Sequence, residues 1–412
     1  MKRWIKGTLA ALSCAALAAM PVSAAPAYII QQGDGATVQE LLDPNSTVWA
    51  PLQDLPTDAA ALQIEAKGAV LMELSTGQIL FAQNADERLP IASVTKVMTL
   101  LLIMEAVDQG LLGYDERITC SANAASMGGS QIWLEEGESM TVDHLLKAIA
   151  VVSANDACVM MAEHLCGSVE EFVRRMNLRA AQLGMTDTQF LDCSGLNDEG
   201  YSSAADVAKM SRELMLHHPD ITRYTTIWTD TLRNGQSQLV NTNKLVRHYS
   251  GATGLKTGTT AAAGYCLSAT AQRDGMGLVA VVLGSDTTDH RFGGARKMLD
   301  YGFASYTLCL PQTEGLLPPS IKVLHGEQST VAPVADTPSP LLLRKGGEKA
   351  LSHTVQLCAD VQAPVEAGQI LGRITYTLDG QPCGTCPIRA ARAVPRLTFG
   401  GALKRLLRAL VQ

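Results

Sequence analysis

The sequence lacks two features that would indicate large classes of function. It has no excess of positive charge, because 33 Lys and Arg stand against 40 Asp and Glu, and the net charge of −7 gives no sign of a nucleic-acid-binding protein. Its eight His are scattered without H-E-x-x-H or a similar metal-binding pattern. What remains is ordinary globular material, 47% hydrophobic and 18% charged over 412 residues, which is enough for two or three domains.

The N-terminus has no apolar run long enough to cross a membrane comfortably. Gly7 to Met20 gives only about 14 apolar residues, which argues against the alternative of a transmembrane anchor. Basic residues precede this run, and Val22-Ser23-Ala24 follows it as an A-x-A-like cleavage site. The sequence therefore predicts a signal peptide over residues 1–24 and an exported protein.

Cysteine is present but forms no recognisable metal-binding set. Nine of the ten Cys follow the predicted cleavage site, and an odd number leaves at least one without an intramolecular partner. Cys158, Cys166 and Cys266 stand in apolar contexts and are expected to be small core residues. Cys383-Gly-Thr-Cys386 has redox or zinc spacing without a second pair, so a local disulfide or buried thiols are favoured over a metal.

The order of apolar patterns predicts an α+β catalytic domain, an α/β sandwich with a helical insert, over residues 65–311. Residues 25–64 show no clear period and are predicted to be a leader or linker. Strands are expected at 68–74, 78–82, 254–260, 265–272 and 276–284, mostly helical structure from 97 to about 223, and a closing helix at 289–306. Strands before and after a helical middle are typical of this fold class.

Two further segments follow the Pro-rich join at Leu317-Pro318-Pro319. Residues 318–390 alternate short apolar stretches with Gly and Pro turns, and they are predicted to form a small all-β domain, a β-sandwich. Residues 395–412 form a basic segment whose Leu residues fall on one helical face. This pattern favours an amphipathic helix lying on a membrane surface, with a helix packed on its own domain as the alternative.

The most informative stretch is Ser93-Val94-Thr95-Lys96, directly before the apolar run that begins at Val97. Residues three apart on the first turn of a helix share a face, so Ser93 and Lys96 can touch. A Ser hydroxyl is a poor nucleophile until a base removes its proton, and a Lys can be that base if burial or a nearby cation keeps it neutral. Because S-x-x-K also occurs by chance, the motif needs support from elsewhere in the chain.

Two later motifs provide this support. Ser153-Ala154-Asn155 interrupts the helical pattern between residues 142 and 165, where weak helix formers indicate a break or a functional demand. Lys256-Thr257-Gly258 lies in a predicted strand. Each motif is weak alone, but the ordered set of three is specific.

This ordered set resembles the penicillin-recognising serine acyl-transferase superfamily, in which S-x-x-K, S-x-N and K-T-G converge on one cleft. Within it, the chain is most similar to the low-molecular-mass penicillin-binding proteins that act as D-alanyl-D-alanine carboxypeptidases. The resemblance covers roughly residues 65–390. Within this range, the stretches 190–196 and 301–303 support it. It implies a penicillin-binding/β-lactamase-like catalytic domain, a β domain and a membrane-lying helix.

The resemblance implies a role for each residue of the first two motifs. Ser93 would attack the carbonyl between the two terminal D-Ala units of a peptidoglycan stem peptide. Lys96 would accept its proton, kept neutral by burial and by the nearby cation Lys256. Ser153 would relay a proton to the departing D-Ala amine, and Asn155 would orient Lys96 and bind the substrate amide. Water would then hydrolyse the acyl-enzyme, with no metal or cofactor.

It also implies how the substrate is held. Lys256 and Thr257 would meet the terminal carboxylate, and Gly258 would let the substrate lie against the strand edge as an added strand. The backbone N–H groups of Ser93 and Thr259 would form the oxyanion hole.

Two arginines, Arg233 and Arg291, stand where the family often places residues that steer the carboxylate. Ordinary surface arginines are the alternative interpretation of both.

The function predicted from these motifs is a serine-type D-Ala-D-Ala carboxypeptidase of the cell envelope, at the outer face of the cytoplasmic membrane, inhibited covalently by β-lactams. A D,D-endopeptidase or a serine β-lactamase is the near alternative, and an inactive peptidoglycan-binding protein is the alternative of another class. Residues 184–200 lack the E-x-x-L-N segment of class A β-lactamases, and Ala154 replaces the Gly that the family more often has in its second motif.

Overall fold

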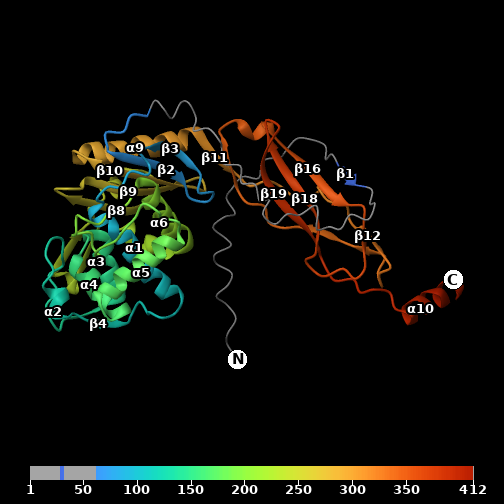
Figure 1. Ribbon diagram of the computed structural model, residues 1–412, viewed down its shortest axis with the longest axis horizontal. Coiled ribbons are helices and arrows are strands. Elements are labelled where there is room, and N and C mark those ends of the chain that lie inside the picture. Colours follow the sequence, from blue (N-terminus) through green and yellow to red (C-terminus); the bar gives the residue numbers. More distant parts are fainter. Residues whose placement is uncertain (1–27, 32–61, 412) are drawn as a thin grey trace. The chain divides into compact units, whose positions relative to one another are not determined.

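The computed structural model of the chain describes residues 28–31 and 62–411 (Figure 1). The predicted signal peptide and most of the predicted leader lie outside these residues. The described residues divide into two compact units. One unit comprises those within Asp54–Ser305, and the other comprises those within Tyr306–Gln412 together with a strand at Tyr28–Gln31.

The first unit is built on a five-stranded antiparallel sheet in the order β3-β2-β10-β9-β8. Its strands are β2 (Gly68–Glu73), β3 (Ile79–Gln83), β8 (Ala252–Thr260), β9 (Gly264–Arg273) and β10 (Met276–Ser285). β2 is buried along its whole length, which fits its nearly continuous apolar sequence. β9 and β10 are joined through Asp274 and Gly275, both at positive φ, as a tight hairpin requires. β8 lies at one edge of this sheet.

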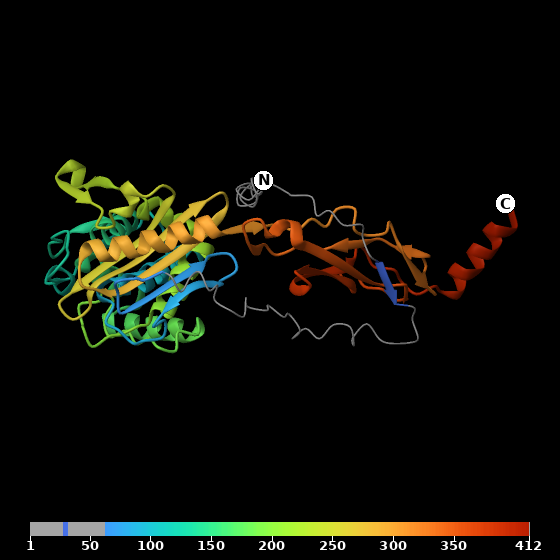
Figure 2. The same cartoon turned by 90° about the horizontal axis from the view of Figure 1, so that it is seen from above.

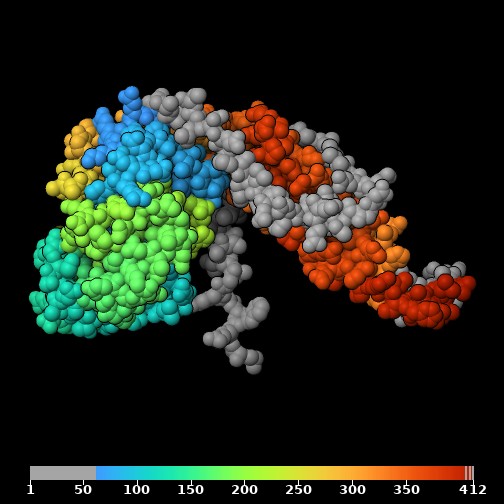
Figure 3. Space-filling view, viewed as in Figure 1, coloured from blue at the N-terminus to red at the C-terminus, as the bar shows by residue number. Residues whose placement is uncertain are grey.

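Helices cover both faces of the sheet (Figures 1 and 2). The long helix α9 (Thr288–Ser305) packs on one face, and α6 (Ala204–His217) and α1 (Lys96–Asp108) belong to the layer on the other. The remaining helices of this unit are α2 (Ala122–Ala125), α3 (Val142–Val152), α4 (Asn155–Cys166), α5 (Val169–Gln182), α7 (Thr222–Thr225) and α8 (Leu245–His248). In the space-filling view these segments adjoin as one continuous body (Figure 3).

Four short strands complete this unit. They form two separate hairpins, β4 (Arg117–Thr119) with β5 (Ser139–Thr141), and β6 (Thr229–Leu232) with β7 (Ser237–Val240).

The predicted break inside residues 142–165 is present and separates α3 from α4. Thr141 caps the start of α3 by accepting a hydrogen bond from the His144 N–H. The helix ends at Ser153, whose φ of 66° lies in the left-handed region. α4 begins two residues later at Asn155. The second motif therefore forms the junction between two helices.

The second unit is an all-β structure with its own apolar core. Its largest sheet has the order β1-β16-β18-β19-β14. The strands are β1 (Tyr28–Gln31), β11 (Tyr306–Cys309), β12 (Ile321–Leu324), β13 (Thr330–Val331), β14 (Pro333–Ala335), β15 (Leu341–Arg344), β16 (Leu351–Cys358), β17 (Asp360–Gln362), β18 (Ile370–Leu378) and β19 (Gln381–Ala390). β16 alternates buried and half-buried residues, as expected for a strand with one face in a core.

The α+β unit with its helical insert, followed by an all-β unit, agrees with the fold class predicted from the sequence. Two details were not foreseen. β1 pairs in parallel with β16 although it lies in the predicted leader, and β11 pairs with β15 although it precedes the predicted boundary at residue 311. The domain boundaries themselves remain predictions.

The chain ends in α10 (Phe399–Val411), at the place where the sequence predicts a helix. Phe399, Leu403, Leu406, Leu407 and Leu410 are exposed on it. Within the described part of the chain, we find no helix with the length and apolar content needed to span a bilayer.

Candidate active site

The first motif places a hydroxyl and an amine in contact. Residues Ala92–Thr95 form a turn of 3₁₀ helix that continues into α1. Lys96 Nζ lies 2.9 Å from Ser93 Oγ, as the three-residue spacing predicts. Lys96 is 0% exposed, whereas Ser93 is half-buried. A substrate can therefore reach the hydroxyl while the amine stays shielded from water.

Lys96 makes two further hydrogen bonds that fix its position. It donates to Asn155 Oδ1 at 2.6 Å and to the Ser194 carbonyl oxygen at 2.6 Å. The Asn155 side-chain amide in turn donates to the Gly128 carbonyl at 2.7 Å, which fixes the orientation of that amide. The prediction that Asn155 orients Lys96 agrees with this geometry.

Burial lowers the pKa of the Lys96 amine below its usual value, against the opposing effect of the nearby Asp192 and Asp156 carboxylates. Burial, and next the charge of Lys96, lowers the pKa of Lys256 well below the usual value. The two buried amines are coupled, so a proton on one disfavours a proton on the other. Such a pair can keep one amine neutral near physiological pH, as a general base requires.

Ser153 belongs to the site through its position rather than through a hydrogen bond. Its side chain is 4% exposed, and its buried Oγ has no hydrogen-bond partner among the residues that the structure describes. Its left-handed backbone costs a residue with a Cβ about 1–2 kcal/mol. A strained residue with an unpaired buried hydroxyl is often a functional one.

The third motif lies directly against the first. A Cβ added to Gly258 would stand 2.6 Å from the Ile91 carbonyl oxygen and 3.0 Å from the Ser93 backbone nitrogen. Glycine is therefore required here so that edge strand β8 can approach the turn that carries Ser93. This requirement differs from the predicted one, in which Gly258 made room for the substrate. Thr259, the other predicted oxyanion-hole residue, follows Gly258 on β8 and pairs with Tyr265.

The other two residues of this motif are also held in place. The Lys256 ammonium donates to the Thr257 carbonyl at 2.9 Å and is almost completely buried. Thr257 Oγ1 donates to Thr242 Oγ1 at 2.6 Å.

Arg291 reaches the third motif from α9. Its Nη1 lies 3.3 Å from the Gly258 carbonyl oxygen and 3.2 Å from Thr259 Oγ1. The side chain is buried, and within the described part of the chain its Nε has no hydrogen-bond partner. Burial also lowers the pKa of this guanidinium. Arg291 is thus part of the structure that surrounds the edge of β8.

Arg233 is not brought to the cluster in the same way. Its guanidinium forms a two-point ion pair with Glu138, at 2.7 and 2.9 Å. It also donates to the Ile132 carbonyl at 2.9 Å and to Ser237 Oγ at 2.9 Å. These partners favour the alternative interpretation, a structural arginine. A guanidinium held by so many contacts is not free to steer a substrate carboxylate.

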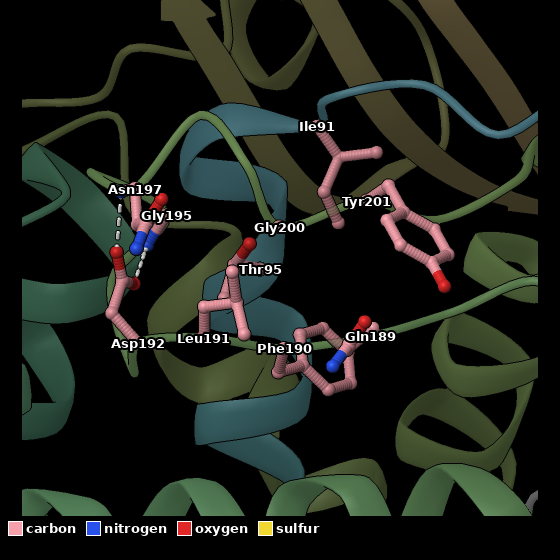
Figure 4. Close-up of a pocket in the computed structure, with 10 residues that line it drawn as sticks. All are labelled: Ile91, Thr95, Gln189, Phe190, Leu191, Asp192, Gly195, Asn197, Gly200 and Tyr201. Carbon is pink, nitrogen blue, oxygen red and sulfur yellow. Dashed lines mark hydrogen bonds between the residues drawn. The ribbon is translucent and has the colours of Figure 1, made fainter.

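The loop 189–201 supports the site through the Ser194 carbonyl, and the sequence did not predict this role. The family resemblance covered residues 190–196 of the loop without assigning them a function. Asp192 accepts hydrogen bonds from the backbone N–H groups of Ser194, Gly195 and Asn197, two of which are seen in Figure 4. This carboxylate shapes the turn that presents the Ser194 carbonyl to Lys96. No pattern in the sequence marks such a carbonyl, because every residue has one.

This loop also lines a small pocket (Figure 4). Thr95 of the first motif and Ile91, which precedes the motif, line it together with residues of the loop such as Phe190 and Tyr201, but Ser93 does not.

The described cysteines are free thiols, of which Cys158, Cys266 and Cys386 are buried, whereas Cys383 and Cys166, which was expected in the core, are only half-buried. All nine Cys within the described residues are unpaired, including Cys383 and Cys386. Cys158 is buried near Lys96, and burial raises its thiol pKa to about 12, so it stays neutral. In the described part of the chain, no group of three His, Cys, Asp or Glu lies close enough together to hold a metal ion.

A nucleophile, a buried amine and an adjacent sheet edge define a serine enzyme of the acyl-transfer class. The family model described as D-alanyl-D-alanine carboxypeptidase matches residues 55–287, and that of the penicillin-binding protein 5 C-terminal domain matches residues 313–396. The chain belongs to the D-alanyl-D-alanine carboxypeptidase family.

Individual relatives agree with this assignment. The D-alanyl-D-alanine carboxypeptidase DacF of Bacillus subtilis is 41% identical over 348 residues, which cover 83% of this chain and 89% of that protein. DacC of Escherichia coli is 31% identical over 84% of this chain and 90% of its own length.

Solved structures show the same fold. Penicillin-binding protein 5 from Haemophilus influenzae superposes with a TM-score of 0.72 at 30% identity, over 81% of this chain and 98% of that one. Penicillin-binding protein D2 from Listeria monocytogenes, solved in its ampicillin-bound form, gives 0.54 at 34% identity, over 59% of this chain and 99% of that one. The predictions of the family, the penicillin-binding-protein fold and the enzyme class, a serine D-alanyl-D-alanine carboxypeptidase, are confirmed.

Proposed function

We propose that this carboxypeptidase removes the terminal D-Ala of peptidoglycan stem peptides with Ser93 as nucleophile and Lys96 as base. The observation that carries the proposal is the fully buried Lys96 amine, 2.9 Å from Ser93 Oγ and held by Asn155. Deprotonated Lys96 takes the hydroxyl proton across this contact as Ser93 Oγ bonds to the carbonyl carbon between the two D-Ala units.

The remaining steps use the other two motifs. The developing oxyanion is assigned to the backbone N–H groups of Ser93 and Thr259, and the close approach of Gly258 to the Ser93 backbone nitrogen supports this assignment. The proton now on Lys96 passes through Ser153 to the leaving D-Ala amine as the C–N bond breaks and the ester to Ser93 is left. Water then attacks the ester carbonyl and gives a proton to Lys96, which passes it to Ser93 Oγ as the C–O bond to Ser93 breaks and the shortened peptide leaves.

The substrate carboxylate is assigned to the edge of β8. Lys256, Thr257 and Arg291 lie there, and Arg291 already contacts Gly258 and Thr259. The two buried cationic groups, Lys256 and Arg291, would bind a terminal carboxylate, and this explains a preference for substrates with a free C-terminus. Arg233 has no part in this assignment because Glu138 occupies its guanidinium.

The test is mass spectrometry of the mature protein mixed with penicillin, combined with an assay of D-Ala release. A β-lactam presents a reactive carbonyl to the same nucleophile, so we expect a long-lived adduct on the unmodified enzyme. Ser93→Ala should lose both the adduct and D-Ala release with an unchanged melting temperature. Ser126→Ala, which removes an exposed hydroxyl at the end of α2, is the matched control and should retain both.

Other outcomes separate the alternatives. An adduct that disappears within a turnover while hydrolysed drug accumulates would favour a β-lactamase. Cleavage of cross-linked dimers in preference to free stem peptides would favour an endopeptidase. Activity retained by Ser93→Ala would refute the mechanism.

We further propose that the protein is exported by residues 1–24 and works at the outer face of the cytoplasmic membrane, with α10 lying on the lipid surface. The exposed apolar side chains of α10 and the basic residues in its sequence support this proposal.

A further inference from the structure

The loop 189–201 packs directly against the first motif. A Cβ added to Gly195 would stand 2.9 Å from Thr95 Oγ1, so the loop backbone lies against the turn that carries the nucleophile. The preceding residue, Ser194, accepts the hydrogen bond from Lys96 Nζ at 2.6 Å. The position of this loop therefore helps to set the position of the base.

Within the loop, the backbone on both sides of Asp198 is fixed by side-chain hydrogen bonds. The Asp192 carboxylate accepts from the Asn197 N–H at 2.6 Å (Figure 4). Asn197 Oδ1 accepts in turn from the Glu199 N–H at 3.0 Å. Asp198 lies between these two residues and is itself exposed, so the chain holds its carboxylate at a defined place on the surface.

The Asp198 carboxylate joins this loop to the end of β8. Its Oδ1 accepts a hydrogen bond from Thr260 Oγ1 at 2.6 Å, and the negative charge of the acceptor strengthens that bond. Thr260 is the last residue of β8, and its Oγ1 also accepts from the Ala263 N–H at 3.0 Å in the turn to β9. One hydroxyl thus closes the turn between the two strands and connects it to the loop.

The end of β8 also carries Thr259, one of the two residues assigned to the oxyanion hole. β8 is an edge strand whose neighbour in the sheet is β9, so its other side depends on contacts from outside the sheet. Arg291 supplies one of these contacts, to Thr259 Oγ1 at 3.2 Å, and Asp198 supplies another at the next residue. The loop that holds Lys96 is therefore also bonded to the strand that holds the oxyanion donor.

We propose that Asp198 is a positioning residue of this carboxypeptidase, because its hydrogen bond to Thr260 fixes the Thr259 N–H relative to Ser93. This inference rests on the proposed function and adds to it a residue that lies outside the three motifs. The oxyanion develops only as the reaction proceeds, so a displaced donor lowers kcat and changes KM little.

The test begins with three variants of the mature chain. Asp198→Ala removes the acceptor, and kcat for D-Ala release and the rate of acylation by penicillin should both fall on the order of tenfold, with KM changed less than about twofold. Asp198→Asn keeps an Oδ1 acceptor and should recover most of the loss. Glu199→Ala removes the adjacent exposed carboxylate and should leave the rates unchanged. An equal loss in Glu199→Ala, or a rise in KM at constant kcat in Asp198→Ala, would overturn the inference.

Variants of Thr260 examine the other partner of the same bond. Thr260→Val removes the hydroxyl at nearly constant volume and should slow both reactions at least as much as Asp198→Ala, whereas Thr260→Ser keeps the hydroxyl and should stay close to the unmodified rates. Because both changes break one bond, the double variant Asp198→Ala/Thr260→Val should be no slower than the slower single variant. Losses that multiply would show that the two residues act independently, which contradicts the proposal.

Hydrogen–deuterium exchange over residues 259–264 provides a readout that does not depend on the catalytic mechanism. Exchange should be faster in Asp198→Ala and unchanged in Glu199→Ala. Faster exchange with unchanged kcat and acylation would exclude the positioning role and leave the mechanism intact. Absence of a penicillin adduct on Ser93 in the unmodified enzyme would instead refute the proposed nucleophile, and kcat for D-Ala release in the same variants would still decide the role of Asp198.

Discussion

Gly258 is the residue at which the first and third motifs meet. The sequence places it inside a K-T-G motif, and its role in the structure is steric: a side chain would stand 2.6 Å from the Ile91 carbonyl oxygen. The approach of β8 to the turn of Ser93 sets the distance between the two proposed oxyanion donors. The position of these two donors matters because a misplacement of a catalytic group by about 1 Å can lower the reaction rate on the order of 100-fold.

Gly258→Ala should therefore reduce D-Ala release on the order of 100-fold and lower the free energy of unfolding by about 1–3 kcal/mol. Kinetics and thermal unfolding measure the two effects. Gly293→Ala on α9 is the control, because a Cβ there meets no atom within 4 Å. It should keep activity and raise the free energy of unfolding by about 0.5–1 kcal/mol. Equal behaviour of the two variants would refute the steric argument.

At the scale of elements, the junction between α3 and α4 joins stability to function. Ser153 ends α3 in a left-handed conformation that glycine adopts at no steric cost. A hydroxyl is retained there although it has no partner within the folded chain's described residues. The strained backbone and the unpaired hydroxyl both lower stability, and the proton relay proposed for Ser153 gives a reason for keeping them.

Ser153→Gly and Ser153→Ala test this point as a pair. Both lose the hydroxyl, so both should lose D-Ala release on the order of 100-fold, the usual contribution of acid–base catalysis. Only Ser153→Gly relieves the backbone, and it should have a free energy of unfolding about 1 kcal/mol above that of Ser153→Ala. Comparable stability of the two variants would show that the left-handed conformation carries little strain.

β16 carries another buried polar side chain, His353. Neither of its ring nitrogens has a hydrogen bond to a residue within 28–31 or 62–411, and burial lowers the pKa of this His. The folded β unit therefore favours neutral His353, while the unfolded chain binds a proton near the ordinary pKa of about 6.5. The stability contribution is complete above that pH and is lost as the pH falls through it.

Calorimetry of the full chain between about pH 8 and pH 5 should show the transition of the β unit moving to lower temperature as the pH falls. In His353→Leu that shift should be smaller. His217→Gln, an exposed His on α6, should behave like the unmodified protein. An identical pH dependence in His353→Leu would exclude His353 as the titrating group.

At the scale of the whole molecule, α10 is the proposed membrane anchor. Residues 395–397 belong to the β unit, because Glu327 N–H donates to the Pro395 carbonyl and Leu397 N–H donates to the His325 carbonyl, both at 2.8 Å. Removal of the helix should therefore begin after these contacts, at residue 399.

Deletion of residues 399–412 should lower partition into anionic vesicles more than tenfold, by about the loss of a full apolar helix face, without changing D-Ala release from a soluble peptide. Vesicle sedimentation measures the first effect. Leu406→Gln, which weakens the apolar face at one exposed position, should give an intermediate value. Unchanged partition of the deletion would show that α10 is not the anchor.

The sequence by itself determined the ordered motifs, the fold class, the break at residues 153–155 and the terminal helix. These features follow from local rules, since helical and strand periods, helix spacing and turn residues act over a few positions. The contact between Ser93 and Lys96 could be predicted because both residues lie within one helical turn. The family resemblance added the expectation that the three motifs converge.

The tertiary structure alone decided which groups complete the site. The Ser194 carbonyl reaches Lys96 across 98 positions of sequence, and Glu138 pairs with Arg233 across 95. It also decided that β1 joins a sheet in the second unit and that Trp133 faces outward while Ile132 and Leu134 are buried. Contacts between residues so far apart depend on how whole elements pack, because a carbonyl, a carboxylate or an exposed indole acquires its role only from the groups that folding brings beside it.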